Sequence, residues 1–222
     1  AGEVRIGAGR FDAWRAEVRI AAVEPLTARS RDGTMVNGLL PRALDADPSK
    51  PQRTVLWIHG GPVAQNDYSF WLEKEVFAAA GWNVLQVNYR GSSGRGEAFQ
   101  RAIYADWCGK EVEDLLASVD EAVRRGIADP QQLAVGGWSY GGILTDCLIA
   151  STTRFKAAIS GAGSSLFTSM YGSDQYPAQY DAELGPPWKN PRLWEKVSYA
   201  FWRAERIKTP TLDTRVDALS GG

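Results

Sequence analysis

The chain has 222 residues, of which 44% are apolar and 23% are charged, a composition typical of one soluble globular domain with a sizeable core. Its 25 basic and 26 acidic residues give a net charge of −1, so the sequence lacks the basic surface that binding to nucleic acid or to an anionic membrane requires. Basic residues are spread along the chain and alternate with acidic ones, as in Glu111, Glu113 and Asp114 followed by Arg124 and Arg125. This pattern predicts a solvated charged surface.

Residues 1–52 form the least regular part of the sequence. They mix short apolar stretches with turn-forming residues such as Arg31, Asp32 and Gly33, which predicts one or two strands or a hairpin. We therefore divide the chain into an N-terminal lead-in, residues 1–30, and a larger domain, residues 31–222.

From Thr54 onward, short apolar runs alternate with segments of helical period. The runs are continuous, as in parallel strands that are buried on both faces. Predicted strands cover residues 55–58, 84–87, 133–135 and 155–160, and predicted helices cover 68–80, 110–125 and 140–150. Repeated strand–helix–strand units of this kind imply a mostly parallel sheet between two layers of helices, a three-layer α/β fold.

The ends of the predicted helices carry recognisable signals. Asn66 or Asp67 is expected to cap the first helix, and Gly81 to end it. The second helix has the clearest period, and its apolar face consists of Val112, Leu115, Leu116, Val119 and Val123. Gly126 closes that helix.

Residues 161–206 are rich in proline and aromatic residues without a clear period, so they receive no assignment. The tryptophans at 188–202 are interpreted as packing.

The sequence gives no sign of a metal site or a bound cofactor. Cys108 and Cys147 are too few for a disulfide framework and too isolated for a zinc site, and the chain has one histidine. Phe99 stands where a dinucleotide-binding motif beginning at Gly94 would need glycine. No apolar run reaches the ~18 residues of a membrane span. We expect a soluble, cytoplasmic protein without cofactor or metal, and the oligomeric state stays open.

The segment Gly137-Trp138-Ser139-Tyr140-Gly141 lies between a predicted strand and a predicted helix. This G-x-S-x-G pattern is the nucleophile elbow of α/β-hydrolases, whose glycines let the serine turn pack closely on its neighbours. It predicts Ser139 as the catalytic nucleophile. Such a serine needs an acid and then a histidine, which follow it in this fold. No histidine follows Ser139 in this chain.

The segment His59-Gly60-Gly61-Pro62 follows the predicted strand 55–58. Hydrolases of this fold place an oxyanion-hole donor at this point of the chain. We predict that the backbone amides of Gly61 and Tyr140 form the oxyanion hole, where glycine lets the backbone approach the reacting carbonyl. His59 lies beside this loop, whereas a base must reach Ser139 from the far side, so we interpret His59 as structural.

Six short segments carry a wider resemblance. They are RDGT at 31–34, HGGP at 59–62, NYRGSSG at 88–94, Asp106-Trp107 with Gly109-Lys110 and Glu113-Asp114, GWSYGG at 137–142 and IKTPTL at 207–212. Together they resemble the catalytic domain of the prolyl oligopeptidase family of serine peptidases, nearest its acylaminoacyl-peptidase-like members. The resemblance implies an α/β-hydrolase fold that acts on short peptides, with Ser139 as nucleophile and Gly61 and Tyr140 at the oxyanion hole.

The chain departs from the family pattern near its C-terminus. Asp213 begins an Asp-x-Arg-Val sequence like that of the family's triad acid, but it follows Leu212 directly, without the strand expected between them. At about 3.3 Å per residue, a missing stretch of about five residues leaves it about 15–20 Å short of the active-site edge. Asp213 is therefore a weak candidate for the acid, and the fold is expected to lack its last strands and helix.

These departures lead to the hypothesis of an incomplete serine peptidase, inactive or severely impaired as this chain. Losing the triad histidine alone lowers turnover by roughly 10⁶. Two alternatives stay open. One is a non-catalytic α/β-hydrolase-like protein that binds a ligand in the former substrate pocket. The other is a carboxylesterase, which fold and nucleophile alone do not distinguish from a peptidase.

Overall fold

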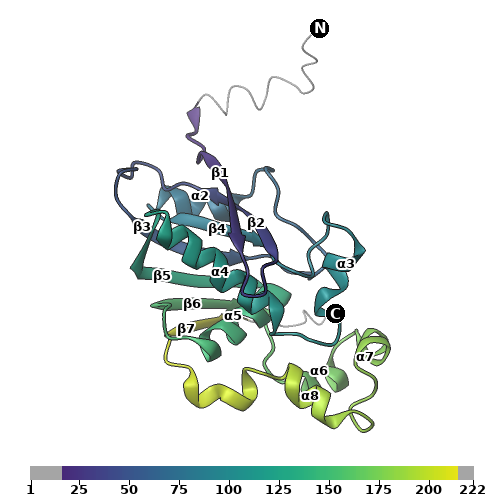
Figure 1. Cartoon of the computed structure of the whole chain (residues 1–222). Coiled ribbons are helices and arrows are strands. Elements are labelled where there is room, and N and C mark those ends of the chain that lie inside the picture. Colours follow the sequence, from purple (N-terminus) through teal and green to yellow (C-terminus); the bar gives the residue numbers. More distant parts are fainter. Residues whose placement is uncertain (1–16, 215–222) are drawn as a thin grey trace, which may run out of the picture.

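The computed structural model describes residues 17–214, and seven strands in this range form one sheet (Figure 1). Their order across the sheet is β1-β2-β4-β3-β5-β6-β7. The pairs β1–β2 and β2–β4 are antiparallel, and the other neighbours are parallel. The strands are β1 (Val23–Arg29), β2 (Met35–Pro41), β3 (Gln52–Ile58), β4 (Asn83–Asn88), β5 (Ala128–Trp138), β6 (Ala157–Gly161) and β7 (Thr211–Thr214). The predicted mostly parallel sheet is confirmed.

The strand order determines which face each long helix covers. The three longest helices of the described range, each of which lies between two parallel strands, are α2 (Leu72–Ala79), α4 (Lys110–Arg124) and α5 (Tyr140–Ser151). The chain passes from β3 to β4 in one direction across the sheet, then returns past β3 to β5 and continues to β6. Because such crossovers are right-handed, α2 lies on one face of the sheet while α4 and α5 lie on the other. Ligand sites in such sheets lie where the direction reverses, here at the carboxyl ends of β3 and β5.

Helices α4 and α5 supply much of the core. In α4 the predicted stripe is confirmed, since Val112, Leu115 and Val119 are buried and the other two residues pack partly against them. In α5 every residue from 140 to 150 except Asp146 is buried. Although α5 is this apolar, no helix in the described range is long and apolar enough to cross a membrane.

Helix α2 begins later than the sequence predicts. Its first residue is Leu72, and the preceding Trp71 makes no capping hydrogen bond through its side chain. Asp67 instead accepts a hydrogen bond from the amide of Ser69 (2.9 Å), and the side chain of Asn66 donates one to β4 (3.3 Å). The predicted cap at Asn66 or Asp67 is wrong because both side chains stabilise the loop before the helix.

The N-terminal part contains the predicted hairpin. β1 and β2 pair along their whole length. In the turn between them Gly33 has a φ of +89°, and Asp32 accepts a hydrogen bond from the amide of Thr34 (3.0 Å). Both strands belong to the seven-stranded sheet, so the division after residue 30 falls at the tip of a hairpin. Residues 1–16 of the lead-in lie outside the described residues.

The segment 161–206, which received no assignment from the sequence, folds into short helices. They are α6 (Phe167–Ser173), α7 (Pro177–Glu183), α8 (Pro191–Val197) and the 3₁₀ helix η2 (Phe201–Arg206). A similar pair, α3 (Glu97–Gln100) and η1 (Arg101–Ile103), follows β4. Two turns of helix contain too few residues to establish a period, so tertiary packing decides these helices.

Strand β7 corrects the expected position of Asp213. The sequence predicts that the strand before this residue is missing, but β7 contains Asp213 and pairs with β6 in parallel register. Asp213 lies opposite Ser160 of β6, which lies opposite Gly137 of β5. Two strand spacings, about 10 Å, therefore separate Asp213 from the strand that leads into Ser139. The predicted absence of a strand at Asp213 is wrong, because four residues suffice to add one strand to the sheet.

Two acidic residues of α4 correct the predicted charged surface. Glu111 and Asp114 are fully buried, whereas Glu113 is partly exposed and Arg124 exposed. Asp114 forms an ion pair with Arg90, which is also buried (2.7 Å). The surface interpretation is wrong for these two acids because a charge pattern along one helix does not show partners that arrive from other elements.

A disulfide joins Cys108, in the loop before α4, to Cys147 of α5. Two cysteines separated by 39 positions did not indicate a pair, because sequence separation does not report distance in the fold. Their Cα atoms are 5.8 Å apart, which a disulfide spans. Both residues are buried, so the bond ties the loop before α4 to α5 within the core.

We expect the double variant Cys108→Ala/Cys147→Ala to lose about 2–4 kcal/mol of unfolding free energy, because the bond restricts the unfolded chain. Guanidinium unfolding of the oxidised wild type and of the variant measures the loss. Wild-type protein treated with a dithiol serves as the control and should unfold at the midpoint of the variant. Two free thiols titrated in unreduced, denatured wild type would contradict this prediction.

Candidate active site

Ser139 occupies a sharp turn between β5 and α5. Its φ of 58° and ψ of −120° place a non-glycine residue in a sparsely populated backbone conformation. The amide of Ser139 donates a hydrogen bond to the carbonyl of Gly161 on β6 (2.8 Å), which holds the turn against the sheet. A serine held in this way is typical of the nucleophile elbow, where the hydroxyl stands clear of strand and helix.

The glycines two residues either side of Ser139 are required by close packing. A Cβ atom on Gly137 would lie 2.6 Å from the carbonyl oxygen of Ile58, and one on Gly141 would lie 2.1 Å from the same oxygen. Both distances are far inside van der Waals contact. The elbow therefore packs directly on the end of β3, as the G-x-S-x-G spacing predicts.

The loop that follows β3 passes close to Ser139. A Cβ atom on Gly60 would lie 3.2 Å from Cβ of Ser139. The next residue, Gly61, has a φ of +122°, which side-chain-bearing residues rarely adopt. Gly61, Ser139 and Tyr140 all line one pocket, so the structure brings the three predicted site residues together. Tyr140 is the first residue of α5, and its amide therefore has no acceptor within the helix.

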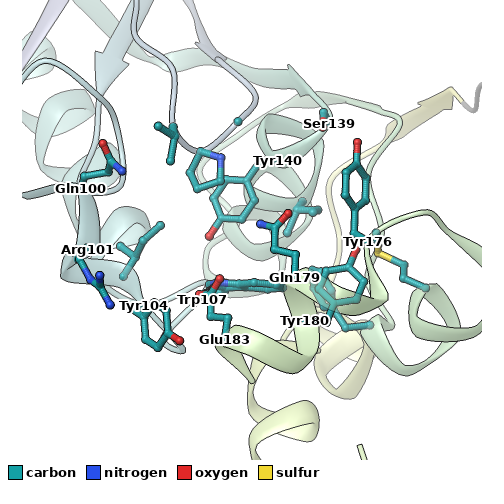
Figure 2. Close-up of a pocket in the computed structure, with 17 residues that line it drawn as sticks. Gln100, Arg101, Tyr104, Trp107, Ser139, Tyr140, Tyr176, Gln179, Tyr180 and Glu183 are labelled. Carbon is teal, nitrogen blue, oxygen red and sulfur yellow. Dashed lines mark hydrogen bonds between the residues drawn. The ribbon is translucent and has the colours of Figure 1, made fainter. Parts of the chain in front are cut away.

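A pocket of about 380 Å³ opens beside Ser139 (Figure 2). Six of the seventeen residues that line it are aromatic, namely Tyr104, Trp107, Tyr140, Phe167, Tyr176 and Tyr180, and besides Ser139 four are polar or charged, namely Gln100, Arg101, Gln179 and Glu183. The indole of Trp107 packs edge-on against three of these rings and donates a hydrogen bond to Glu183 (2.7 Å). Figure 2 shows Tyr104 and Trp107, from the loop before α4, beside Tyr180 and Glu183 of α7.

This pocket wall was not predicted from the sequence. Its residues come mainly from 100–107 and 167–183, where short helices left no period to read. The abundance of aromatic residues in 161–206 was the only available signal. The tryptophans at 188–202 do not line this pocket. Trp194 is fully buried, as the packing interpretation predicts, whereas Trp188 and Trp202 are exposed, so that interpretation is wrong for these two.

His59 is held away from the reacting position by its own hydrogen bonds. Burial lowers the pKa of its ring, which is therefore neutral near pH 7. Nδ1–H donates to the carbonyl of Gly60 (2.7 Å), and Nε2 accepts from the hydroxyl of Ser92 (2.9 Å). The ring also stacks on Tyr89, with centroids 4.5 Å apart. These contacts support the structural interpretation of His59, because neither nitrogen is directed to Ser139.

Two carboxyl groups lie near the carboxyl ends of β6 and β7. Asp146 of α5 accepts a hydrogen bond from Ser165 (2.9 Å). Burial raises the pKa of Asp146, and the charge of Asp213 acts in the same direction, so the two carboxyls are close enough to interact. Asp213 thus lies in the region where this fold carries its triad acid, and its role stays a prediction.

The site therefore combines a presented serine with a pocket that contains several aromatic residues. Gly61 and Tyr140, whose amides are the predicted oxyanion donors, line the same pocket. Among residues 17–214, no group of three or more His, Cys, Asp or Glu side chains is arranged to hold a metal ion. What the described residues do not supply is an imidazole in hydrogen-bonding reach of Ser139, since His59 is the single histidine of the sequence.

Comparisons with known proteins identify the family. Residues 68–215 match the family model described as the prolyl oligopeptidase family. The uncharacterized peptidase YuxL of Bacillus subtilis (strain 168) is 33% identical over 208 residues, which cover 92% of this chain and 31% of that protein. Dipeptidyl aminopeptidase BIII of Pseudoxanthomonas mexicana is 34% identical over 201 residues, or 85% of this chain and 29% of that protein.

The fold is similar to that of a solved acylaminoacyl peptidase in complex with Z-Gly-Gly-Phe-chloromethyl ketone. The TM-score is 0.86 at 24% identity, over 93% of this chain and 33% of that one. This likeness confirms the predicted α/β-hydrolase architecture. The chain spans about a third of the length of the relatives it matches. With two thirds of its residues inside the family match, and with the elbow and the loop after β4 among them, the chain belongs to the prolyl oligopeptidase family.

Proposed function

We propose that Ser139 is the nucleophile of a serine peptidase that cleaves short peptides through an acyl-enzyme intermediate. The observation that carries the proposal is the strained elbow at Ser139, which shares a pocket with Gly61 and Tyr140. Ser139 Oγ bonds to the scissile carbonyl carbon, and the amides of Gly61 and Tyr140 receive the oxyanion. The C–N bond then breaks, and the proton from the serine hydroxyl leaves on the amine.

The aromatic wall indicates what the pocket accepts. Trp107, Phe167 and Tyr180 offer ring faces and edges that suit an apolar or aromatic side chain. A volume of about 380 Å³ accommodates one such side chain. The related acylaminoacyl peptidase was solved with a peptide inhibitor that ends in phenylalanine, which supports the same preference here.

Turnover by this chain alone is expected to be slow, because the proton of Ser139 has no imidazole to receive it. In triad enzymes the loss of histidine costs roughly 10⁶ in turnover, while the oxyanion hole and substrate binding retain roughly 10³–10⁴ over water. Asp213 is proposed as the acid of the same site, since β7 brings it to the correct edge of the sheet.

One alternative is a protein that binds a ligand in this pocket without catalysing a reaction. The engagement of His59 by Gly60 and Ser92 favours a non-catalytic protein that binds a peptide-like ligand beside Ser139. A carboxylesterase is the weaker alternative, because the named relatives that match most of this chain are peptidases.

We expect a fluorophosphonate probe to label Ser139 slowly, and added imidazole to accelerate the labelling, because the free base can accept the proton that His59 does not reach. Mass spectrometry of the labelled peptide measures the rate. The variant Ser139→Ala should show no labelling with or without imidazole, whereas Ser173→Ala, an exposed serine of α6, should behave as wild type. A folded wild type that stays unlabelled in imidazole would favour the binding protein instead.

A further inference from the structure

The carboxyl group of Glu111 lies in the protein interior. Its burial costs free energy of folding, and its hydrogen bonds do not fully offset that cost. Glu111 lies in the first turn of α4 and is fully buried. Its Oε1 accepts hydrogen bonds from the hydroxyl of Tyr140 (2.8 Å) and from the amide of Cys108 (2.9 Å). Its Oε2 is buried without a hydrogen-bond partner among residues 17–214. A glutamate in this state destabilises the fold, so its contact with Tyr140 calls for an explanation beyond packing.

We propose that Glu111 is a positioning residue of the active site, which holds the backbone amide of Tyr140 beside Ser139 by way of the Tyr140 hydroxyl. This inference rests on the proposed function, in which that amide stabilises the oxyanion. Tyr140 directly follows Ser139 and begins α5, so a side chain fixed at both its ring and its hydroxyl also fixes the direction of its N–H.

The ring of Tyr140 belongs to a stack that reaches both sides of the oxyanion hole. Its centroid is 6.4 Å from that of Tyr89 and 6.2 Å from that of Trp107. Tyr89 in turn stacks on His59, and its hydroxyl donates a hydrogen bond to the carbonyl of His59 (2.9 Å). The loop that carries Gly61 and the residue Tyr140 therefore pack on one buried cluster of rings. Glu111 contacts this cluster through the hydroxyl of Tyr140.

The disulfide reinforces the same connection. The amide of Cys108 donates to Glu111, and its sulfur is bonded to Cys147, two turns along α5 from Tyr140. Glu111 and the disulfide thus join the start of α4 to α5 at two points. Movement of Tyr140 relative to the loop before α4 is resisted by both.

Glu111 also gives the site a group that titrates near neutrality. Burial raises the pKa of Glu111 to about 7, and the charge of Asp106 acts in the same direction. The facing hydroxyls of Tyr140 and Tyr89 stay neutral, since burial raises the pKa of each well above its usual range. The ionised carboxylate accepts a stronger hydrogen bond than the acid does. Tyr140 is therefore held more firmly as the pH rises through 7.

The test compares Glu111→Gln, which keeps an acceptor oxygen but does not titrate, with Tyr140→Phe, which removes the hydroxyl. The matched control is Glu113→Gln, two residues along the same helix and partly exposed. NMR follows the amide resonance of Tyr140 between pH 5 and 9 in each protein, and fluorophosphonate labelling in imidazole at pH 8 compares the reactivity of Ser139 among the proteins.

In wild type and Glu113→Gln we expect the Tyr140 amide resonance to shift with a midpoint near pH 7, and this step to vanish in Glu111→Gln. Labelling at pH 8 should fall roughly ten-fold in Tyr140→Phe, as expected for a modest misplacement of one oxyanion donor. An amide that does not titrate in wild type, or that titrates equally in Glu111→Gln, would overturn the inference. Absence of labelling in every protein would instead count against the proposed function, and the amide titration would still decide the role of Glu111.

Discussion

Replacing Arg90 by methionine should lower the free energy of unfolding by about 3–5 kcal/mol, because it leaves the carboxylate of Asp114 buried without its partner. The guanidinium donates to Asp114 from Nε (3.0 Å) and from Nη2 (2.7 Å), and the amide of Arg90 donates to the same carboxylate (2.8 Å). Arg90 also bonds to Ser30 and Asp32 in the hairpin turn. One side chain therefore joins the hairpin, the loop after β4 and α4.

Thermal or guanidinium unfolding measures this loss, which corresponds to a melting temperature lower by roughly 10 °C for a chain of this size. Arg124→Met is the matched control. Arg124 pairs with Glu121 on the exposed side of α4, the helix that contains Asp114, so this variant should change the free energy of unfolding by less than about 1 kcal/mol. The double variant Arg90→Met/Asp114→Asn removes the stranded charge and should recover part of the loss. Equal effects of Arg90→Met and Arg124→Met would show that Asp114 is not buried as a charge.

The same loop connects this ion pair to the active site. Two residues beyond Arg90, the hydroxyl of Ser92 bonds to His59 (2.9 Å), and a Cβ atom on Gly91 would lie 3.3 Å from Pro62. The loop after β4 therefore packs against the loop that carries Gly61. Loss of Arg90 is expected to loosen the loop of the proposed oxyanion hole as well as the fold.

The features that the sequence predicted well are those that depend on neighbouring residues. Gly137 and Gly141 follow from the steric needs of a single turn, and the stripe of α4 follows from helical period. Continuous apolar runs predicted the inner parallel strands, because a strand covered on both faces has no polar side. The motifs after two such strands then placed Ser139 and Gly61 at the same edge of the sheet.

What the sequence did not predict depends on partners far along the chain. Glu111 and Asp114 look like surface residues until Tyr140 and Arg90 are brought against them. Cys108 and Cys147 pair only because α5 packs beside the loop before α4. The aromatic pocket and the strand with Asp213 likewise depend on short elements whose conformation is set by packing, not by local pattern.

Replacing Gly141 by alanine is expected to lower the free energy of unfolding by more than about 3 kcal/mol, at least as much as Arg90→Met does. The variant should also show no detectable labelling of Ser139. The added Cβ would lie 2.1 Å from the carbonyl oxygen of Ile58 and 2.9 Å from its carbonyl carbon. Both atoms belong to the backbone of β3, so no change of side-chain rotamer relieves the clash. Either α5 moves away from the sheet, or the turn at Ser139 changes its conformation.

The matched control is Gly172→Ala in α6, where an added Cβ meets no atom within 4 Å. Alanine favours helix over glycine, so this variant should be neutral or more stable by up to about 1 kcal/mol. Unfolding experiments on both variants, with labelling in imidazole as the second measurement, separate a fault of the elbow from a general intolerance of alanine. If Gly141→Ala kept wild-type stability and labelling, the packing of the elbow on β3 would be refuted, and with it the geometry from which Ser139 is proposed as the nucleophile.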